Sequence, residues 1–292
     1  MLNSGDIQTA LNSIYPFYLA NRQNGMLHYD DNGDGFIVNY DISEQSNNAA
    51  FIIHGWWGSA SSSIVQRYAS ILKKNGYSII CINLKDHCND YSISKSLFSF
   101  GDINYIYNYI ETMKGKYKKI ILLSFSFGAN IALRLKNVNV FDRIILISPV
   151  FDIASAFQSI EKKMIYRKIL LSKWKSYLKT KQSIYFKQYD LTNSLRGKSI
   201  YEIINGFISY IGCDTVEQYY VQNSITDVHI NNVKRSTLLI HSQNDPIIQL
   251  SNIYSENEAL NANKSICLCV HEDGGHCPYL GKDIFAWLNS HE

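Results

Sequence analysis

The sequence predicts an α/β protein in which a mostly parallel central sheet carries helices on both faces and an inserted helical cap. Short apolar runs alternate with amphipathic stretches, and this alternation is typical of strands joined by crossover helices. The runs are rich in β-branched residues, as expected for strands buried on both faces. Strands are predicted at residues 49–55, 77–84, 119–125, 143–149, 236–242 and 265–272. Helices are predicted near residues 61–75, 98–115, 128–136, 252–262 and 281–290.

The alternation stops between about residue 150 and residue 230, where no apolar run of strand type occurs. This stretch has the pattern of several consecutive helices. We therefore expect a core formed by residues 1–149 and 231–292, with residues 150–230 inserted as a helical cap, or lid.

Composition narrows the class of protein. The chain has 292 residues, of which 46% are apolar and 18% charged, so it can bury a large core. A net charge of +3 is too small to indicate a nucleic-acid partner. No signal peptide and no apolar run of about 18 residues is evident, and six cysteines without a CxxC pair do not predict a zinc site. A cytoplasmic protein without a metal or cofactor is expected.

The segment LLSFSFGAN (residues 122–130) suggests a nucleophile. An apolar strand ends at Ser126, and a helix is predicted to follow at once, which is the setting of a nucleophile elbow. The usual pattern is G-x-S-x-G, whereas here Ser124 stands in the place of the first glycine and Gly128 keeps the second. Ser126 is therefore the candidate nucleophile, and Ser124 is the departure from the pattern.

A serine nucleophile needs a base, and the base needs a carboxylate that orients it. On this architecture the acid and the base follow the serine in that order, at the ends of later strands. Asp245 comes just after the strand at 236–242, and His276 follows the strand at 265–272. Both positions match, so Ser126, Asp245 and His276 are the candidate triad.

The segment HGWWGSA, which begins at His54, follows the first core strand. Acyl transfer needs backbone N–H groups directed at the developing oxyanion. We expect these groups to come from Trp56 and from Phe127, the residue after the nucleophile. His54, Gly55 and Trp57 are expected to line the substrate pocket, and one of the two indoles could instead pack on the cap.

These segments, with HSQNDPII and DGGHCPYL, resemble the α/β-hydrolase superfamily, and more narrowly its YheT-like branch of predicted esterases and acyl hydrolases. The stretches NLKDHCNDYSISKSLF, YRKILLSKWK and SIYEIINGFISYIGCDTVEQYY also resemble that branch, so the resemblance covers roughly residues 26–290. It implies an α/β-hydrolase fold, the same triad and a helical cap over the site. The expected substrate is a small ester or thioester with an apolar acyl group. An acyltransferase on the same triad and a non-catalytic binding protein are the alternatives.

Three other features carry weaker signals. DDNGDGFIVNYD (residues 30–41) has the spacing of a calcium loop, but strand-like flanks favour a hairpin turn at Asn32–Gly33. Residues 85–88, Lys-Asp-His-Cys, could line the rim of the site. Asp152 is a possible alternative acid that we interpret as the cap of the first inserted helix.

Residues 162–181 carry eight basic side chains and no acidic one. An apolar stripe at helical spacing runs beside them, formed by Tyr166, Leu170, Trp174 and Tyr177. The favoured interpretation is a cap helix that packs this stripe on the core and leaves its lysines in solvent. Weak contact with an anionic membrane surface, or attraction of an acidic substrate, is the alternative.

Overall fold

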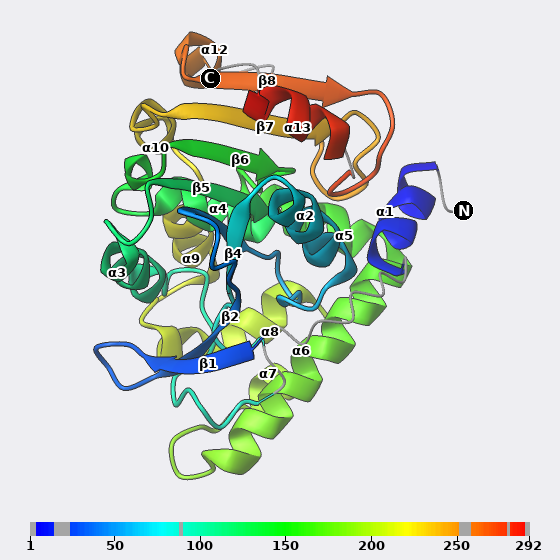
Figure 1. Cartoon of the computed structure of the whole chain (residues 1–292). Helices are drawn as coiled ribbons and strands as arrows, with labels where there is room; N and C mark the ends of the chain where they lie inside the picture. Colours follow the sequence, from blue (N-terminus) through cyan, green and yellow to red (C-terminus); the bar gives the residue numbers. More distant parts are fainter. Residues whose placement is uncertain (1–3, 15–23, 88–89, 251–257, 279–280, 290–292) are drawn as a thin grey trace.

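A computed structural model describes residues 4–14, 24–87, 90–250, 258–278 and 281–289. Its centre is a mostly parallel sheet in the strand order β1-β2-β4-β3-β5-β6-β7-β8 (Figure 1). Only the pairs β1–β2 and β2–β4 are antiparallel. The strands are β1 Asn24–Tyr29, β2 Gly35–Asp41, β3 Asn48–Ile53, β4 Tyr77–Ile82, β5 Lys119–Phe125, β6 Arg143–Ile147, β7 Ser236–Ser242 and β8 Ile266–His271. All six predicted strands are confirmed, and each ends within two residues of the expected position.

Two hydrophobic clusters, one on each face of the sheet, form the core. One contains residues of α2 Ser63–Lys74 and α13 Gly281–Asn289. The other contains residues of α3 Asn104–Met113 and α4 Phe127–Arg134, together with the segment that follows β6. The short helix α12 Glu258–Ala262 precedes β8, and α1 Ser4–Ile14 lies at the N-terminal end. Residues 251–257, where the fourth predicted helix begins, lie outside the described residues.

The predicted helix at 98–115 is shorter than expected, because α3 begins only at Asn104. The residues before it are tied to the inserted helices instead. The Phe98 N–H donates to the Tyr177 hydroxyl at 2.7 Å, and the Phe100 N–H donates to the Tyr219 hydroxyl at 3.0 Å. These donors are used by side chains from elsewhere in the chain, which a local pattern does not reveal.

Between β6 and β7 the described chain forms helices and no strand. The helices are α5 Ile153–Lys162, α6 Met164–Ile184, α7 Thr192–Arg196, α8 Ile200–Phe207, α9 Val216–Asn223 and α10 Asp227–Asn231. Asp152 caps α5, as predicted, by accepting a hydrogen bond from the Ser155 N–H. None of the helices in the described ranges is both long enough and apolar enough to cross a membrane.

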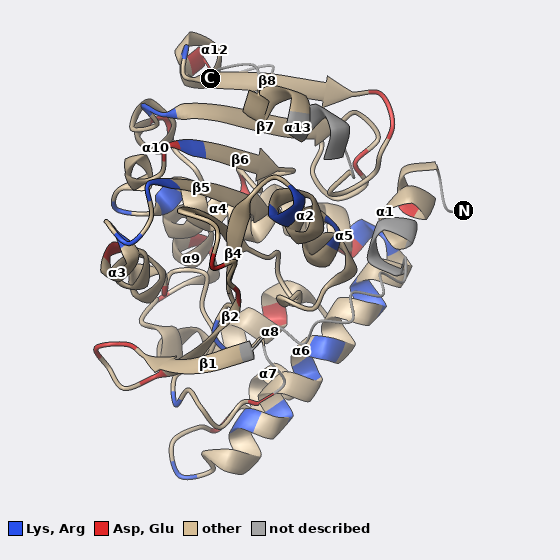
Figure 2. Ribbon diagram, viewed as in Figure 1, with Lys and Arg blue, Asp and Glu red and all other residues tan. Residues whose placement is uncertain are grey.

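Helix α6 is the longest inserted helix, and basic residues occur along it (Figure 2). Its predicted apolar stripe is confirmed: Trp174 and Tyr177 are buried, and Tyr166 and Leu170 pack against the core. The expectation that its lysines are solvated is wrong for Lys181, which is fully buried. A neighbouring carboxylate and two backbone carbonyls explain this exception, as described below.

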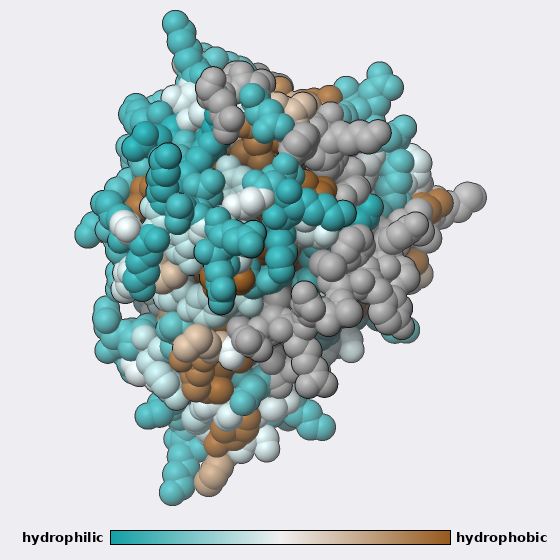
Figure 3. All heavy atoms as spheres, viewed as in Figure 1, coloured by the Kyte–Doolittle hydropathy of each residue, from teal (hydrophilic) through white to brown (hydrophobic). Residues whose placement is uncertain are grey.

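The hairpin predicted at Asn32–Gly33 is confirmed. Strands β1 and β2 pair across it, and Gly33 has a φ of 78°, a conformation that glycine adopts easily. Strand β1 forms one edge of the sheet, and its Met26 and Leu27 side chains are exposed. Apolar residues gather on this part of the surface (Figure 3). Two acidic residues of this hairpin, Asp30 and Asp34, face inward and bind donors from other segments.

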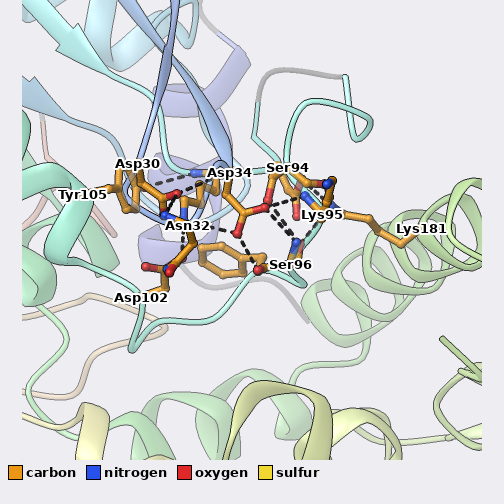
Figure 4. Close-up of polar contacts among 12 residues, drawn as sticks. Asp30, Asn32, Asp34, Ser94, Lys95, Ser96, Asp102, Tyr105 and Lys181 are labelled. Atoms are coloured by element: carbon orange, nitrogen blue, oxygen red, sulfur yellow. Dashed lines mark hydrogen bonds and ion pairs between the residues drawn. The ribbon is translucent and has the colours of Figure 1, made fainter. Parts of the chain in front are cut away.

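These acidic residues belong to a buried polar network. The Lys85 ammonium lies 2.6 Å from both the Asp30 and the Asp102 carboxylates, and Lys85 is only 3% exposed. Asp34 accepts hydrogen bonds from the Lys95 and Ser96 N–H groups. Figure 4 shows Asp30, Asp34 and Asp102 side by side around this point. The network fixes the hairpin on the loop that follows β4.

A second buried lysine extends the network to the inserted helices. Lys181 of α6 lies 3.0 Å from Asp86 and donates to the Ser94 and Ser96 carbonyl oxygens at 2.6 and 3.0 Å (Figure 4). Burial raises the pKa of Asp86 to about 6, although Lys181 and the Tyr177 hydroxyl favour its charged form. Lys181 therefore anchors α6 to the loop around Ser94.

We expect Lys85→Met to lower the free energy of unfolding by about 3–5 kcal/mol, because it leaves buried carboxylates without their cation. Lys73→Met is the matched control, since Lys73 pairs with Asp41 at the surface and its loss should cost less than about 1 kcal/mol. Urea unfolding followed by circular dichroism measures both values. Equal losses in the two variants would contradict the role given to Lys85.

Candidate active site

Ser126 lies at the sharp turn between β5 and α4. Its backbone has φ 51° and ψ −120°, a conformation that costs a residue with a side chain about 1–3 kcal/mol. Its N–H donates to the Ile147 carbonyl at 2.8 Å, which holds the turn on β6. The turn therefore places the Ser126 side chain at the carboxyl end of the parallel strands.

Gly128 allows this turn to pack. A Cβ at Gly128 would lie 2.3 Å from the His54 carbonyl oxygen, closer than any side chain tolerates. Ser124, the departure from the usual pattern, is fully buried in β5, two residues before the turn, and its hydroxyl has no hydrogen-bond partner among the described residues. The second glycine of the pattern is thus sterically required here, whereas the first position accepts a serine.

The structure brings Ser126, His276 and Asp245 together. His276 Nε2 lies 2.8 Å from Ser126 Oγ, and His276 Nδ1 lies 2.8 Å from Asp245 Oδ2. Because a carboxylate only accepts hydrogen bonds, Nδ1 carries the proton and Nε2 accepts from the serine hydroxyl. The other oxygen of Asp245 accepts from the Ile247 and Ile248 N–H groups at 2.8 and 2.9 Å. Every polar atom in this chain therefore has a defined partner.

Burial and charge act on the pKa values of the pair in opposite directions. Burial alone would lower the pKa of His276, but the Asp245 carboxylate raises it to well above the ordinary histidine value. For Asp245, burial alone would raise the pKa, but the charge of His276 and its hydrogen bond lower the pKa to below the ordinary value. The pair stabilises a positive charge on His276, which a base that takes a proton from Ser126 requires.

Helix α1 supports the loop that carries His276, a role that the sequence analysis did not predict. The His276 N–H donates to Thr9 Oγ1 at 2.8 Å, and the Gly274 N–H donates to Gln8 Oε1 at 3.0 Å. The Gly275 N–H donates to Asn244 Oδ1 at 2.9 Å. The two contacts with α1 join residues more than 200 positions apart, so no local motif could have revealed them.

The loop after β3 lies directly beside Ser126. A Cβ at Gly55 would be 3.2 Å from the Ser126 Cβ, so the glycine allows the two segments to approach. Within the described part of the chain, neither the Trp56 nor the Phe127 N–H donates to another backbone group. Phe127 is the first residue of α4, where N–H groups have no partner within the helix. Both groups are thus available to a ligand next to Ser126.

His54 holds this loop in place. Its Nδ1 donates to the Gly55 carbonyl at 2.8 Å, and its Nε2 accepts from the Leu84 N–H at 3.1 Å. Burial lowers the pKa of His54 to about 4, so the ring is neutral at physiological pH. Both ring nitrogens are occupied, and His54 therefore positions the loop and takes no part in proton transfer.

A cavity of about 460 Å³ opens over Ser126 and His276. The three residues predicted to line the pocket, His54, Gly55 and Trp57, all do so, as does Trp56. The Trp56 ring also packs on Trp174 of α6, with ring centroids 5.0 Å apart. It is therefore both a pocket wall and a contact with the inserted helices.

The proposed rim at residues 85–88 is not part of this cavity wall. Lys85 and Asp86 belong to the buried network, and His87 lies under the Trp57 ring with centroids 5.3 Å apart. Residue 88 lies outside the described residues. The prediction that Lys85, Asp86 and His87 line the rim is therefore wrong. Lys85 and Asp86 form buried ion pairs and His87 stacks on Trp57, and sequence alone does not show these contacts.

Strained backbone gathers at this edge of the sheet. Among the described residues, the non-glycine positions with positive φ are Trp57, Asp86, Ser126, Ser148 and Cys277. They follow β3, β4, β5, β6 and β8 by one to six residues. Such strain persists where the surrounding structure enforces it, and it is common at functional sites. The strain is therefore concentrated at the carboxyl edge of the parallel strands, where Ser126 and His276 also lie.

Comparison with known proteins agrees with this architecture. A family model for the alpha/beta hydrolase fold matches residues 51–186. Among solved structures, the esterase Pf2001 of Pyrococcus furiosus has a TM-score of 0.60 at 16% identity, covering 92% of this chain and 87% of that one. Est1E from Butyrivibrio proteoclasticus with bound ferulic acid has a TM-score of 0.57 at 13% identity, covering 90% and 95%.

A third similar structure is the serine hydrolase CCSP0084 from Cycloclasticus zankles, a bacterium that degrades polyaromatic hydrocarbons. Its TM-score is 0.58 at 14% identity, and the match covers 91% of this chain and 96% of that one. No curated protein sequence matches the chain. The predicted fold class is confirmed: this chain has the α/β-hydrolase fold.

We expect Gly128→Ala to disrupt the site, because its methyl group would collide with backbone at His54. The variant should lose about 2 kcal/mol or more of stability, and the loop beside Ser126 should shift. Ser124→Ala is the control, since it removes a buried hydroxyl without a partner and should be neutral or stabilising by up to about 1 kcal/mol. Thermal unfolding measures both. A Gly128→Ala variant as stable as the wild type would contradict this account of the turn.

Proposed function

We propose that the protein is a serine hydrolase that cleaves a carboxylic ester or thioester through an acyl-enzyme. The observation that carries the proposal is the pair of 2.8 Å contacts that link Asp245 to His276 and His276 to Ser126. Ser126 would be the nucleophile, His276 the base and Asp245 the group that orients the base. Ser126 and His276 line a cavity, which gives a substrate access to the serine.

The chemistry would proceed in two steps. His276 Nε2 takes the proton of Ser126 Oγ as the oxygen attacks the carbonyl carbon, and Asp245 stabilises the imidazolium that results. The imidazolium then protonates the leaving alcohol or thiol, and the acyl group remains on Ser126. In the second step His276 takes a proton from the water that attacks the acyl-enzyme. The imidazolium then gives that proton to Ser126 Oγ as the bond to the acyl group breaks and the acid leaves.

The negative charge on the carbonyl oxygen would be held by the Trp56 and Phe127 N–H groups. Support comes from the place of Phe127 directly after Ser126, from the close approach of the loop that carries Trp56, and from the lack of backbone acceptors for both N–H groups in the described residues. Fixed donors of this kind stabilise a developing oxyanion at little reorganisation cost. His54, Gly55 and Trp57 would shape the pocket around the reacting carbonyl.

We also propose that residues 150–230 act as a cap over the site. Leu170 of α6 lines the cavity, and Trp174 packs on Trp56, so the inserted helices contribute directly to the pocket. An apolar acyl chain would fit beside these side chains. Assignment to the YheT-like branch remains a prediction based on the sequence segments quoted above. The broader class is supported by the structural neighbours, which include esterases and a serine hydrolase.

Hydrolysis of 4-nitrophenyl esters of graded chain length tests this function. We expect turnover by the wild type and by Ser124→Ala, and a loss of at least about a thousandfold in kcat for Ser126→Ala and His276→Ala. Product analysis with added alcohol separates hydrolysis from acyl transfer, the alternative reaction on the same residues. Equal turnover by Ser126→Ala would contradict the proposal.

The pH profile tests the pair formed by Asp245 and His276. His276 must be neutral to accept a proton, so kcat/KM should fall as the pH drops through its pKa. Because Asp245 raises that pKa, the acid limb of the profile should lie above the ordinary value of about 6.5. Asp245→Asn removes the charge, so the limb should move to lower pH while kcat also falls. A limb that stays in place in Asp245→Asn would contradict the assignment.

A further inference from the structure

The charged side chains that line the candidate active-site cavity are of one sign only. The described residues that line it include no aspartate or glutamate, and Asp245 lies behind His276. The one lysine among them is Lys173, on helix α6. His54, also in the wall, is neutral for the reasons given above. A substrate in this cavity therefore meets a positive charge and no negative side chain.

The core fixes the position of Lys173. The next residue, Trp174, is buried and packs against Trp56, while Leu170, one turn earlier, lines the same cavity. Lys181 ties the same helix to the loop around Ser94. Contacts of neighbouring residues therefore fix the helix backbone at Lys173, while the flexible Lys173 side chain is exposed.

Several basic residues of this region have acidic partners, whereas Lys173, like Lys168, Lys175 and Lys179 of α6, has none among the described residues. Lys163 pairs with Asp6, Arg167 with Glu161, and Lys181 with Asp86. Among the described residues Lys173 makes no ion pair and no side-chain hydrogen bond. The Lys173 ammonium therefore has no competing carboxylate among the described residues and is open to a ligand in the cavity.

The start of helix α2 makes a second positive contribution to the electrostatic potential in the cavity. The residues at the start of α2, from Ser62 to Val65, line the cavity, and the first turn of this helix has no acidic residue. The Ser62 hydroxyl accepts from the Ser59 N–H and does not cap α2. The positive end of the helix dipole is therefore uncompensated there, and it adds to the effect of Lys173.

We propose that the substrate carries an anionic oxygen group, a carboxylate or a phosphate, away from the reacting carbonyl, and that Lys173 binds this group. This inference rests on the proposed function and narrows it from esters in general to anionic esters. An aliphatic segment would lie along Trp57 and Leu170, and its charged end would reach Lys173. Lys173 would determine specificity and would take no part in bond making or breaking.

A binding experiment tests the site without turnover. Calorimetry would measure the affinity of Ser126→Ala for hexanoate, hexyl phosphate and hexanol, and then repeat each titration with Lys173→Met or Lys173→Glu added. We expect Lys173→Met to weaken at least one anion about fivefold, as for a partly exposed ion pair, and Lys173→Glu to weaken it further. Hexanol should be unaffected. A loss confined to one anion identifies the group as carboxylate or phosphate, and anion affinities equal in all three proteins would overturn the proposal.

Lys168→Met is the matched control, because Lys168 is an exposed lysine on the same helix that does not line the cavity. It should leave the anion affinities unchanged. Where Lys168→Met and Lys173→Met weaken the anions equally, the effect is one of net charge, and the assignment to Lys173 fails.

Turnover then separates this proposal from the proposed function. The ratio of kcat/KM for 4-nitrophenyl hydrogen adipate to that for 4-nitrophenyl hexanoate should fall about fivefold in Lys173→Met, and the difference should shrink in high salt. Hydrolysis of both esters with an unchanged ratio would overturn the anionic substrate and leave the hydrolase intact. Loss of anion affinity in Lys173→Met, with neither ester hydrolysed by the wild type, would support the anion site and refute the hydrolase.

Discussion

The strained backbone at Ser126 is the constraint on which the rest of the site depends. Its left-handed conformation lifts the hydroxyl above the end of β5, where His276 can reach it at 2.8 Å. The turn exists because Gly128 lets α4 pass close to the His54 carbonyl and because the Ser126 N–H is held by Ile147. Hydrogen bonds that the His276 loop donates to side chains of α1, and two that Asp245 accepts from backbone N–H groups, then fix the partners of the serine.

The inserted helices are fixed to the core by several buried contacts, and these contacts also fix one wall of the pocket. Buried Lys181 joins α6 to the loop around Ser94, and the Tyr177 and Tyr219 hydroxyls accept backbone N–H groups from Phe98 and Phe100. Trp174 rests on Trp56. The cavity wall therefore combines a rigid sheet edge with a firmly anchored helix, an arrangement that suits recognition of a substrate at two separate points.

Much of the fold could be predicted because its signals are local. Each apolar run is a strand, and Ser126, Asp245 and His276 follow β5, β7 and β8, whose carboxyl ends meet at one edge in a parallel sheet. The features that could not be predicted depend on contacts between residues far apart in the sequence. The contact of Thr9 with His276, the burial of Lys181 and the inward turn of residues 85–87 arise from segments brought together only by folding, so their sequence signals are those of ordinary surface residues.

The most direct test of the central claim, an activated Ser126, is labelling with a fluorophosphonate probe followed by intact-mass and peptide analysis. The account predicts a single adduct, located on Ser126, which forms quickly in the wild type, slowly in His276→Ala and not at all in Ser126→Ala. A well-folded wild type that takes up no probe, or that carries the adduct on another residue, would contradict it.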